Sequence, residues 1–183
     1  MSVQKDLKLI ESTPISFAQV QSLVAPRIRK LLVMRELDKL PKHCQTKDIF
    51  GGKRFCAMYC ARYSNWQKQI AAHWVCLIKQ GSKIIFFDSL GHSPTALVHL
   101  LNSPKHHGFL DWVKKNQVSS NTTRLQNKYD QDCGDHIAVR LTKHALSTKQ
   151  YVKWIKSFHL NTDHLVSLMV FTQLYPRVSN QAS

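Results

Sequence analysis

Four residues whose side chains can together transfer an acyl group follow one another along the chain. His73 comes first, and Asp88, Gln126 and Cys133 follow in that order. A thiol is a nucleophile, an imidazole can act as its base, a carboxylate can orient that base, and a primary amide can donate a hydrogen bond to an oxyanion. These residue types therefore predict thiol-dependent acyl transfer.

Each of these residues also has an ordinary structural interpretation. A free cysteine is most often a buried packing thiol, and a lone histidine in a strand most often packs or lies on the surface. Asp88 also fits a strand-end aspartate that caps the next turn. Gln126 also fits a plain loop glutamine, and Gln131 is a second candidate for the oxyanion amide. Trp74 is expected to be a core or pocket aromatic beside the base.

The first two residues lie on a predicted β-hairpin. Two β-rich runs, 73–79 and 83–88, are joined at Gly81-Ser82, which is a two-residue turn signal. Pairing across this turn places Asp88 on the same face of the sheet as His73, near enough for the side chains to meet. A slip of one residue would move Asp88 to the opposite face, so the prediction depends on the turn.

Cys133 begins a helical pattern, because Ile137, Leu141 and Ala145 continue at intervals of four residues. A cysteine on the first turn of a helix lies near unpaired N–H groups and the positive end of the helix dipole. We therefore expect the pKa of this thiol to be lowered.

The remaining pattern predicts an α+β fold with a small mixed sheet and helices packed on it. A capping-box signal at Ser16 and Gln19 opens one helix. The other predicted elements are a helix over 28–40, a loop over 43–52, short helices over 96–101 and 109–113, a strand over 118–125, closing helices over 148–158 and 163–174, and a frayed tail over 178–183.

The order of the four residues resembles the adenoviral proteinase (adenain) family, whose clan also includes the SUMO and Nedd8 deconjugating proteases. Papain-like proteases have the opposite order, with the cysteine before the histidine. The matching features are His73-Trp74, a second strand ending at Asp88, and Gln126 seven residues before Cys133-Gly134, with Lys53-Arg54-Phe55 ahead of the histidine strand. Asp88 stands where adenoviral members usually carry Glu, and no cysteine precedes Gln126 where adenain has the one that binds its activating peptide.

The resemblance implies an adenain-like fold in which residues 49–183 form the protease domain and residues 1–48 are an unmatched helical extension. It implies a cysteine endopeptidase with His73, Asp88, Gln126 and Cys133 as catalytic residues, processing viral precursor or scaffold proteins at Gly-containing sites during particle maturation. It also implies action in the virion and host nucleus, with DNA as an activating polyanion. The chemistry itself requires no metal ion or cofactor, and the missing cysteine leaves a peptide cofactor open.

Two other functions remain open. The same chemistry would serve an isopeptidase of the deubiquitinase or SUMO-protease type that acts on Gly-Gly tails, and Asp88 is compatible with that branch. The chain would instead be a basic nucleic-acid-binding module if the four residues were accidental or inactive.

The net charge is +15, and the predicted catalytic part carries most of it. Residues 1–48 hold nine Lys and Arg against five Asp and Glu, whereas residues 49–183 hold seventeen against six. A domain this basic is expected to bind nucleic acid through its phosphates. Because no base-reading motif is recognisable, DNA binding should depend on salt and be indifferent to sequence. The alternative is a basic protein with no polyanionic partner.

Length and composition fit one domain, since 183 residues of which 43% are hydrophobic can bury a sufficient core. The absence of an apolar leader and of a membrane-length apolar run predicts an intracellular protein that is neither secreted nor membrane-bound. The five cysteines are a poor disulfide framework. Zinc is not expected, because the candidate ligands lack finger-like spacing; they are His43, Cys44, Cys56, Cys60 and Cys76.

Ile49-Phe50-Gly51-Gly52, followed by Lys53, matches the substrate preference of the adenain family. Self-cleavage after Gly52 is one hypothesis for this pair of glycines. The other is a glycine turn that leads into the first core element. We favour the turn, because a match of only two glycines is weak evidence for a cleavage site.

Overall fold

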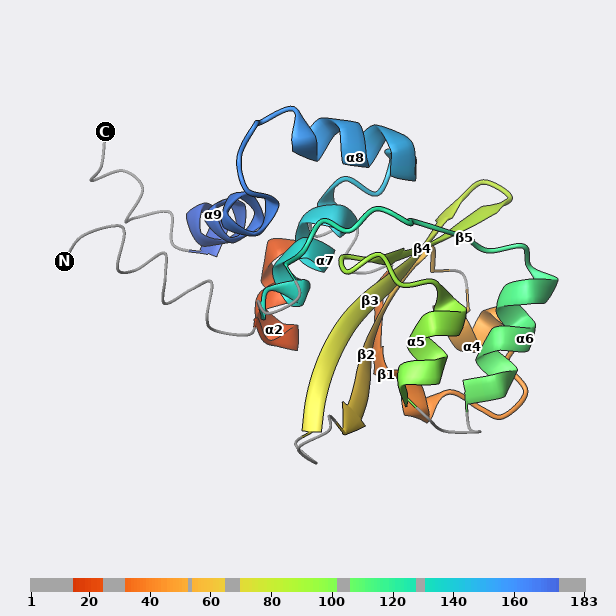
Figure 1. The fold of residues 1–183 in the computed structure, drawn as a ribbon. Helices are drawn as coiled ribbons and strands as arrows, with labels where there is room; N and C mark the ends of the chain where they lie inside the picture. The colour runs from red at the N-terminus through yellow and green to blue at the C-terminus, as the bar shows by residue number, and fades with distance from the viewer. Residues whose placement is uncertain are drawn as a thin grey trace.

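The computed structural model describes residues 15–24, 32–52, 54–64, 70–101, 106–127 and 131–174. Figure 1 shows the arrangement of the helices and strands. In chain order they are α2 (Phe17–Leu23), β1 (Leu32–Glu36), the 3-10 helix η1 (Leu37–Lys39), α4 (Thr46–Phe50), β2 (Cys56–Ser64), β3 (Ile70–Gln80), β4 (Lys83–Asp88), α5 (Pro94–Leu101), α6 (His107–Lys115), β5 (Ser119–Ser120), α7 (Cys133–Thr142), α8 (Thr148–Lys156) and α9 (Thr162–Leu174).

The strands form one mixed five-stranded sheet in the order β1-β2-β3-β4-β5. The outer strands β1 and β5 run parallel to β2 and β4, respectively, and the central strand β3 runs antiparallel to both β2 and β4. Helices lie on both sides of this sheet (Figure 1). The predicted α+β fold, a small mixed sheet flanked by helices, is therefore confirmed.

Both faces of the sheet are buried, which explains why its central strands are apolar on both sides. One face carries side chains such as Met58 and Cys76 and packs against α2, α7, α8 and α9. The other face carries side chains such as Tyr59 and Leu77 and packs against α4, α5 and α6. Cys56, Cys60 and Cys76 are free thiols of the first core, whereas Cys44 packs on the second.

The β3–β4 hairpin has the register expected from its turn. Gln80 pairs with Lys83, and Val75 pairs with Asp88. Gly81 between the strands has a φ of 61°, a conformation that favours glycine. His73 and Asp88 consequently lie on the same face, as predicted.

The helix predicted over residues 28–40 is wrong where the structure describes it. Residues 32–36 form strand β1, and η1 follows directly. β1 lies parallel to β2, with Leu32 opposite Cys56. Pairing with an available sheet edge outweighs helix propensity in an apolar run of this length. The described residues of 1–48 and 49–183 therefore share one sheet, and residues 28–31 lie outside the described part.

Two further predictions also need correction. The segment 43–52, predicted as a loop, contains α4, in which the Asp48 side chain accepts a hydrogen bond from the Gln45 backbone N–H at 2.8 Å. The strand predicted over 118–125 is limited to the two residues of β5. The strand stops there because the Asn121 side chain, rather than backbone, bonds the N–H and C=O of Asp88.

The other predicted helices are present. The capping box of Ser16 and Gln19 opens α2, and α5, α6, α8 and α9 lie in the predicted segments. Cys133 is the first residue of α7. Within the described residues, no helix has the length and apolar character needed to cross a membrane. The tail predicted over 178–183 lies outside those residues.

Candidate active site

His73 and Asp88 meet across the β3–β4 hairpin. His73 Nε2 lies 2.9 Å from Asp88 Oδ1, and both side chains are buried. The diagonal placement on one face of an antiparallel ladder, set by the turn, brings them into hydrogen-bonding distance. The hairpin alone thus assembles an imidazole and a carboxylate.

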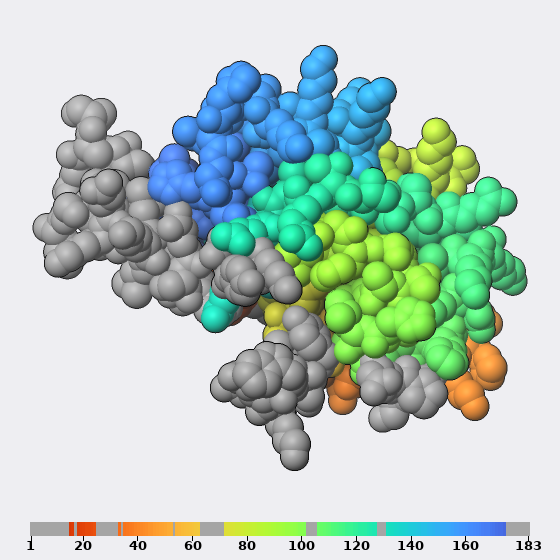
Figure 2. Space-filling model, in the orientation of Figure 1, coloured from red at the N-terminus to blue at the C-terminus, as the bar shows by residue number. Residues whose placement is uncertain are grey.

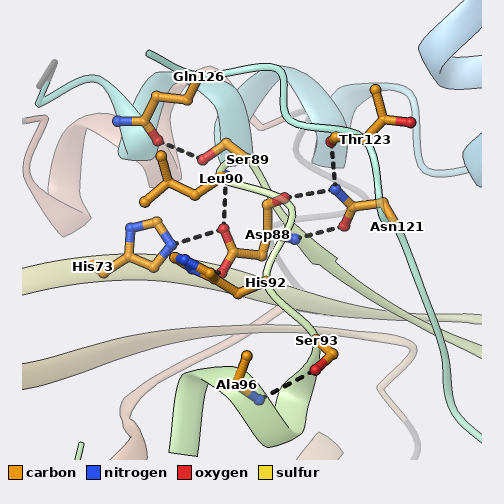
Figure 3. Close-up of polar contacts among 10 residues, drawn as sticks. All are labelled: His73, Asp88, Ser89, Leu90, His92, Ser93, Ala96, Asn121, Thr123 and Gln126. Carbon is orange, nitrogen blue, oxygen red and sulfur yellow. Dashed lines mark hydrogen bonds and ion pairs between the residues drawn. The ribbon is translucent and has the colours of Figure 1, made fainter. Parts of the chain in front are cut away.

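The Asp88 carboxylate accepts further hydrogen bonds from the turn that follows it (Figure 3). The backbone N–H of Leu90 donates to Oδ1 at 2.7 Å, and His92 Nδ1 lies 3.2 Å from Oδ2. Burial alone would raise the pKa of Asp88, but hydrogen bonds and charge interactions with His73 and His92 outweigh it and lower the pKa. Asp88 is therefore a carboxylate at neutral pH.

His73 also contacts the predicted nucleophile. Burial of the ring would lower its pKa, but hydrogen bonds with Asp88 and Cys133, together with their charges, raise it well above the ordinary value. Because Nε2 faces Asp88, Nδ1 is the ring nitrogen left for the Cys133 thiol. The imidazole thus interacts with both a carboxylate and a thiol.

Cys133 lies at the N-terminal end of α7, where Asp132 occupies the cap position. Cys133 is only 6% exposed, and it packs in the same core as Trp74. Gly134 lies so close to the N-terminal segment that a Cβ there would come within 2.0 Å of Ile15 Cγ2. The glycine therefore allows the segment before α2 to pack against the first turn of the nucleophile helix.

Gln126 is held beside the turn that follows Asp88. The backbone N–H groups of Leu125 and Gln126 both donate to Ser89 O, at 2.8 and 3.0 Å. The Ser89 hydroxyl donates to Gln126 Oε1 at 2.6 Å. Since the side-chain oxygen faces Ser89, the amide nitrogen points away from it, as Figure 3 shows.

The four residues singled out in the sequence therefore belong to one connected site. His73 bonds to Asp88 and Cys133, and Gln126 bonds to Ser89, the residue after Asp88. Gln131, the competing glutamine, is exposed.

Three residues of this site were missed in the sequence. Asn121 is buried, and its side chain binds the Asp88 backbone at 2.9 Å through Oδ1 and at 2.6 Å through Nδ2. Ser89 and His92 follow Asp88 in a turn whose only sequence signal was Gly91. A signal for His92 is its spacing of four residues from Asp88, whereas nothing in the sequence distinguishes Asn121 from a polar loop residue.

Two groups of side chains have ligand atoms close enough to share a metal ion. In each group the ligand atoms lie within 4.8 Å of one another. The first group is His73, Asp88 and His92. The other is Asp132, His136 and Asp163, which lies beside the start of α7. In both groups a histidine is already hydrogen-bonded to an aspartate.

Comparisons with known proteins give a limited result. No family model and no curated protein matches the sequence. Among solved structures, the chain is similar to the SUMO protease Ulp1 with its catalytic cysteine oxidised to a sulfonic acid, at 12% identity and a TM-score of 0.41, covering 93% of this chain and 84% of that chain. It is similar to the same protease with a sulfinic acid, at 12% identity and a TM-score of 0.41, covering 91% and 83%. A likeness of this size does not identify an activity, and neither structure is an adenoviral proteinase.

Proposed function

We propose that this protein is a cysteine peptidase with Cys133 as nucleophile, His73 as general base and acid, and Asp88 as the group that orients His73. The observation that carries this proposal is a buried imidazole that is hydrogen-bonded to a carboxylate and also interacts with a thiol at a helix start. Such a constellation is defined by geometry and roles rather than by fold.

The reaction follows from the contacts. The Cys133 thiol gives its proton to His73 Nδ1, and the sulfur forms a bond to the carbonyl carbon of the substrate. The carbonyl electron pair moves to oxygen, where the Gln126 amide and the Cys133 backbone N–H donate to it. His73 then protonates the leaving amine as the C–N bond breaks. Water attacks the thioester, His73 takes its proton, and the thiolate is released.

The other cysteines are poor competitors for an electrophile. Burial, and then the charge of Asp48, raise the pKa of Cys44 to about 11. Burial is also the main cause of the raised pKa values of Cys56, Cys60 and Cys76. These thiols remain protonated at neutral pH, whereas Cys133 has an imidazole to receive its proton.

Labelling with an electrophilic peptide tests the peptidase proposal. A glycine-containing peptide with a vinyl sulfone at its C-terminal end should modify Cys133 alone at neutral pH, as mapped by mass spectrometry. The Cys44→Ala variant should be labelled like the wild type, and the Cys133→Ala variant should not be labelled. Absence of labelling in the wild type would instead support an inactive basic module.

The substrate class is a further part of the proposal. The position of Gln126 seven residues before Cys133, with the His73-Trp74 pair, favours an adenain-type endopeptidase that processes viral precursor or scaffold proteins in the virion and host nucleus. An isopeptidase acting on ubiquitin-like Gly-Gly tails is the second candidate, which Asp88 favours. Turnover of Gly-containing peptides, measured beside turnover of ubiquitin-like and SUMO-like fluorogenic conjugates, separates the two.

Sequence-independent binding of DNA, with DNA as a candidate activator, is supported by the surface charge. Among the described residues after Asp111, every acidic side chain is buried. Segment 106–127 and α8 lie side by side on the face seen in Figure 2, with the tip of the β3–β4 hairpin between them. A groove of about 860 Å³ there includes three lysines in its lining, Lys83, Lys115 and Lys149. The exposed cations of this part are Lys114, Lys115, Arg124, Lys143, Lys149, Lys153 and Lys156.

Titration of unrelated DNA duplexes at several salt concentrations tests this binding. The affinity should fall steeply as salt rises and should barely depend on base sequence. Lys115→Gln combined with Lys149→Gln should weaken binding and flatten the salt response, while Lys39→Gln outside the groove should have less effect. A flat salt response in the wild type would contradict the proposal.

Self-cleavage after Gly52 has less support in the fold. Gly51 and Gly52 end α4 with φ values of 57° and 91°, which supports the glycine-turn interpretation. Ala61 is opposite His73 in the sheet, so the start of β2 at Cys56 is about 16 Å further along the strand. This arrangement does not favour cleavage within one molecule. Mass spectrometry of wild type and Cys133→Ala would reveal a new N-terminus at Lys53 only if it occurs.

A further inference from the structure

Helix α9 begins with two side chains that hold the segment around Gln126. The Thr162 hydroxyl donates to the backbone carbonyl of Leu125. The backbone N–H of Asn127 donates to Asp163 Oδ2 at 2.9 Å. The residues on either side of Gln126 are therefore both bonded to the first turn of α9.

The same turn of α9 also contacts the nucleophile helix. Asp163 Oδ1 lies 2.8 Å from His136 Nε2, and His136 follows Cys133 by three residues on α7. Ser167, one turn further along α9, donates to Asp135 at 2.9 Å. The Asp163 carboxylate thus connects the Gln126 segment and the Cys133 helix directly.

The two side chains at the centre of these contacts, Asp163 and His136, are buried. Asp163 is 6% exposed, and His136 is fully buried with its Nδ1 lacking a hydrogen-bond partner among the described residues. The Asn161 side chain accepts from the backbone N–H groups of Asp163 and His164, at 2.8 and 3.2 Å, which fixes the first turn of α9. A buried carboxylate with two such partners has little freedom to move, because breaking either bond leaves a buried polar group unpaired.

We infer that Thr162 and Asp163, the α9 clamp, are positioning residues that set the Gln126 amide at the correct distance from Cys133. This inference rests on the peptidase proposal above. Ser89 holds the Gln126 side-chain oxygen on one side, and the α9 clamp holds the backbone on the other. Among the described residues, no hydrogen bond or ion pair joins the clamp to Asp88 or His73, so we expect it to act on oxyanion stabilisation and to leave proton transfer to the hairpin.

The clamp predicts a distinct kinetic signature. Asp163→Ala should lower kcat by about 10–100-fold with little change in KM, because a small displacement of a stabilising donor costs mainly transition-state binding. Alkylation of Cys133 by iodoacetamide should keep its wild-type rate, because that substitution at carbon forms no oxyanion. Asp163→Asn should recover most of kcat, since an amide can still accept from Asn127 and donate to His136.

A double-mutant cycle with Gln126→Ala completes the test. If the clamp acts through Gln126, Asp163→Ala should cause little further loss of kcat in the Gln126→Ala background. Thr162→Val, which keeps the shape of the side chain, should show the same dependence and decides the question if Asp163→Ala does not fold. Thr172→Ala, at an exposed position of α9 whose hydroxyl bonds only within the helix, is the matched control.

The clamp and the peptidase proposal would be contradicted by different results. Equal losses in kcat with and without Gln126, a parallel loss of alkylation rate, or a normal kcat in Thr162→Val would overturn the clamp. A wild type that cleaves no peptide and labels at no cysteine would instead remove the peptidase proposal, so the two failures are distinguishable.

Discussion

The β3–β4 hairpin and the 121–127 loop bring their side chains to the site in different ways. On the hairpin, a two-residue turn fixes which residues face each other, and this places His73 against Asp88. The loop lacks a ladder over its described residues, and Gln126 is held there by bonds from Ser89 and α9. One half of the site is thus determined locally, and the other half depends on segments distant in sequence.

This difference separates two kinds of substitution. A change on the hairpin should act on charge and proton transfer, because the ladder register sets His73 diagonally across from Asp88. A change around Gln126 should act on geometry, because several remote contacts must agree to place one amide. Substitutions that touch both halves at once should have the largest effect.

Cys133 and His73 are the pair that joins the two halves, so their loss should be the most severe. Cys133→Ala and His73→Ala should each lower kcat by about 10⁶-fold, and the double variant should be no worse, because the pair acts as a unit. Far-UV circular dichroism of Cys133→Ala should match the wild type. Clearly additive losses would show that thiol and imidazole do not work together.

Gln126→Ala should have the next largest effect. Loss of one oxyanion donor should lower kcat by about 10²–10³-fold, or about 2.7–4 kcal/mol, with KM almost unchanged. Gln131→Ala is the matched control, since Gln131 is exposed and precedes Cys133 by two residues. A change confined to KM would assign Gln126 to substrate binding, and a loss only in Gln131→Ala would exchange the two glutamines.

Asp88→Asn should leave part of the turnover and change its pH dependence. The amide oxygen can still accept from His73 and Leu90, but its charge is gone. Hydrogen bonding and charge from Asp88 raise the pKa of His73, so the substitution should lower that pKa. The imidazolium that protonates the leaving amine is then lost at a lower pH. The alkaline limb of kcat/KM should therefore move down by about 1–3 pH units. An unmoved limb would place the third member of the triad elsewhere.

The two halves also differ in how far the sequence predicts them. The hairpin register and the position of Cys133 at the start of α7 follow from turn chemistry and apolar period, which are properties of neighbouring residues. The contacts of Asn121 and Asp163 depend on which segments the sheet and α9 bring together. No local sequence pattern predicts which distant segments come together, so the sequence around Asn121 indicates only a polar loop.

The prediction of a helix over residues 28–40 was wrong for a related reason. The run from Leu32 to Glu36 carries too few residues for its period to separate helix from strand. The edge of β2 decides the outcome, because its first five residues are available there as a parallel partner. Tertiary pairing of this kind is invisible in a single sequence.

His92→Ala should have the smallest effect. His92 Nδ1 lies 3.2 Å from Asp88 Oδ2, on the side of the carboxylate away from the His73 bond, so its loss removes one of several contacts. We expect kcat to fall by about fivefold, the equivalent of about 1 kcal/mol for one hydrogen bond. His99→Ala, at an exposed position of α5, should match the wild type.

The pH dependence of folding gives a second measure of the same contact. Hydrogen bonding and charge from His73 and His92 lower the pKa of Asp88 in the folded protein, so this group stabilises the fold above its unfolded value of about 4 and loses that contribution as the pH falls. His92→Ala should raise the folded pKa, so its destabilisation, measured by urea unfolding, should be larger at pH 6 than at pH 3. A kinetic loss as large as that of Asp88→Asn would instead make His92 a full partner of His73, and the hairpin would no longer be sufficient to set its half of the site.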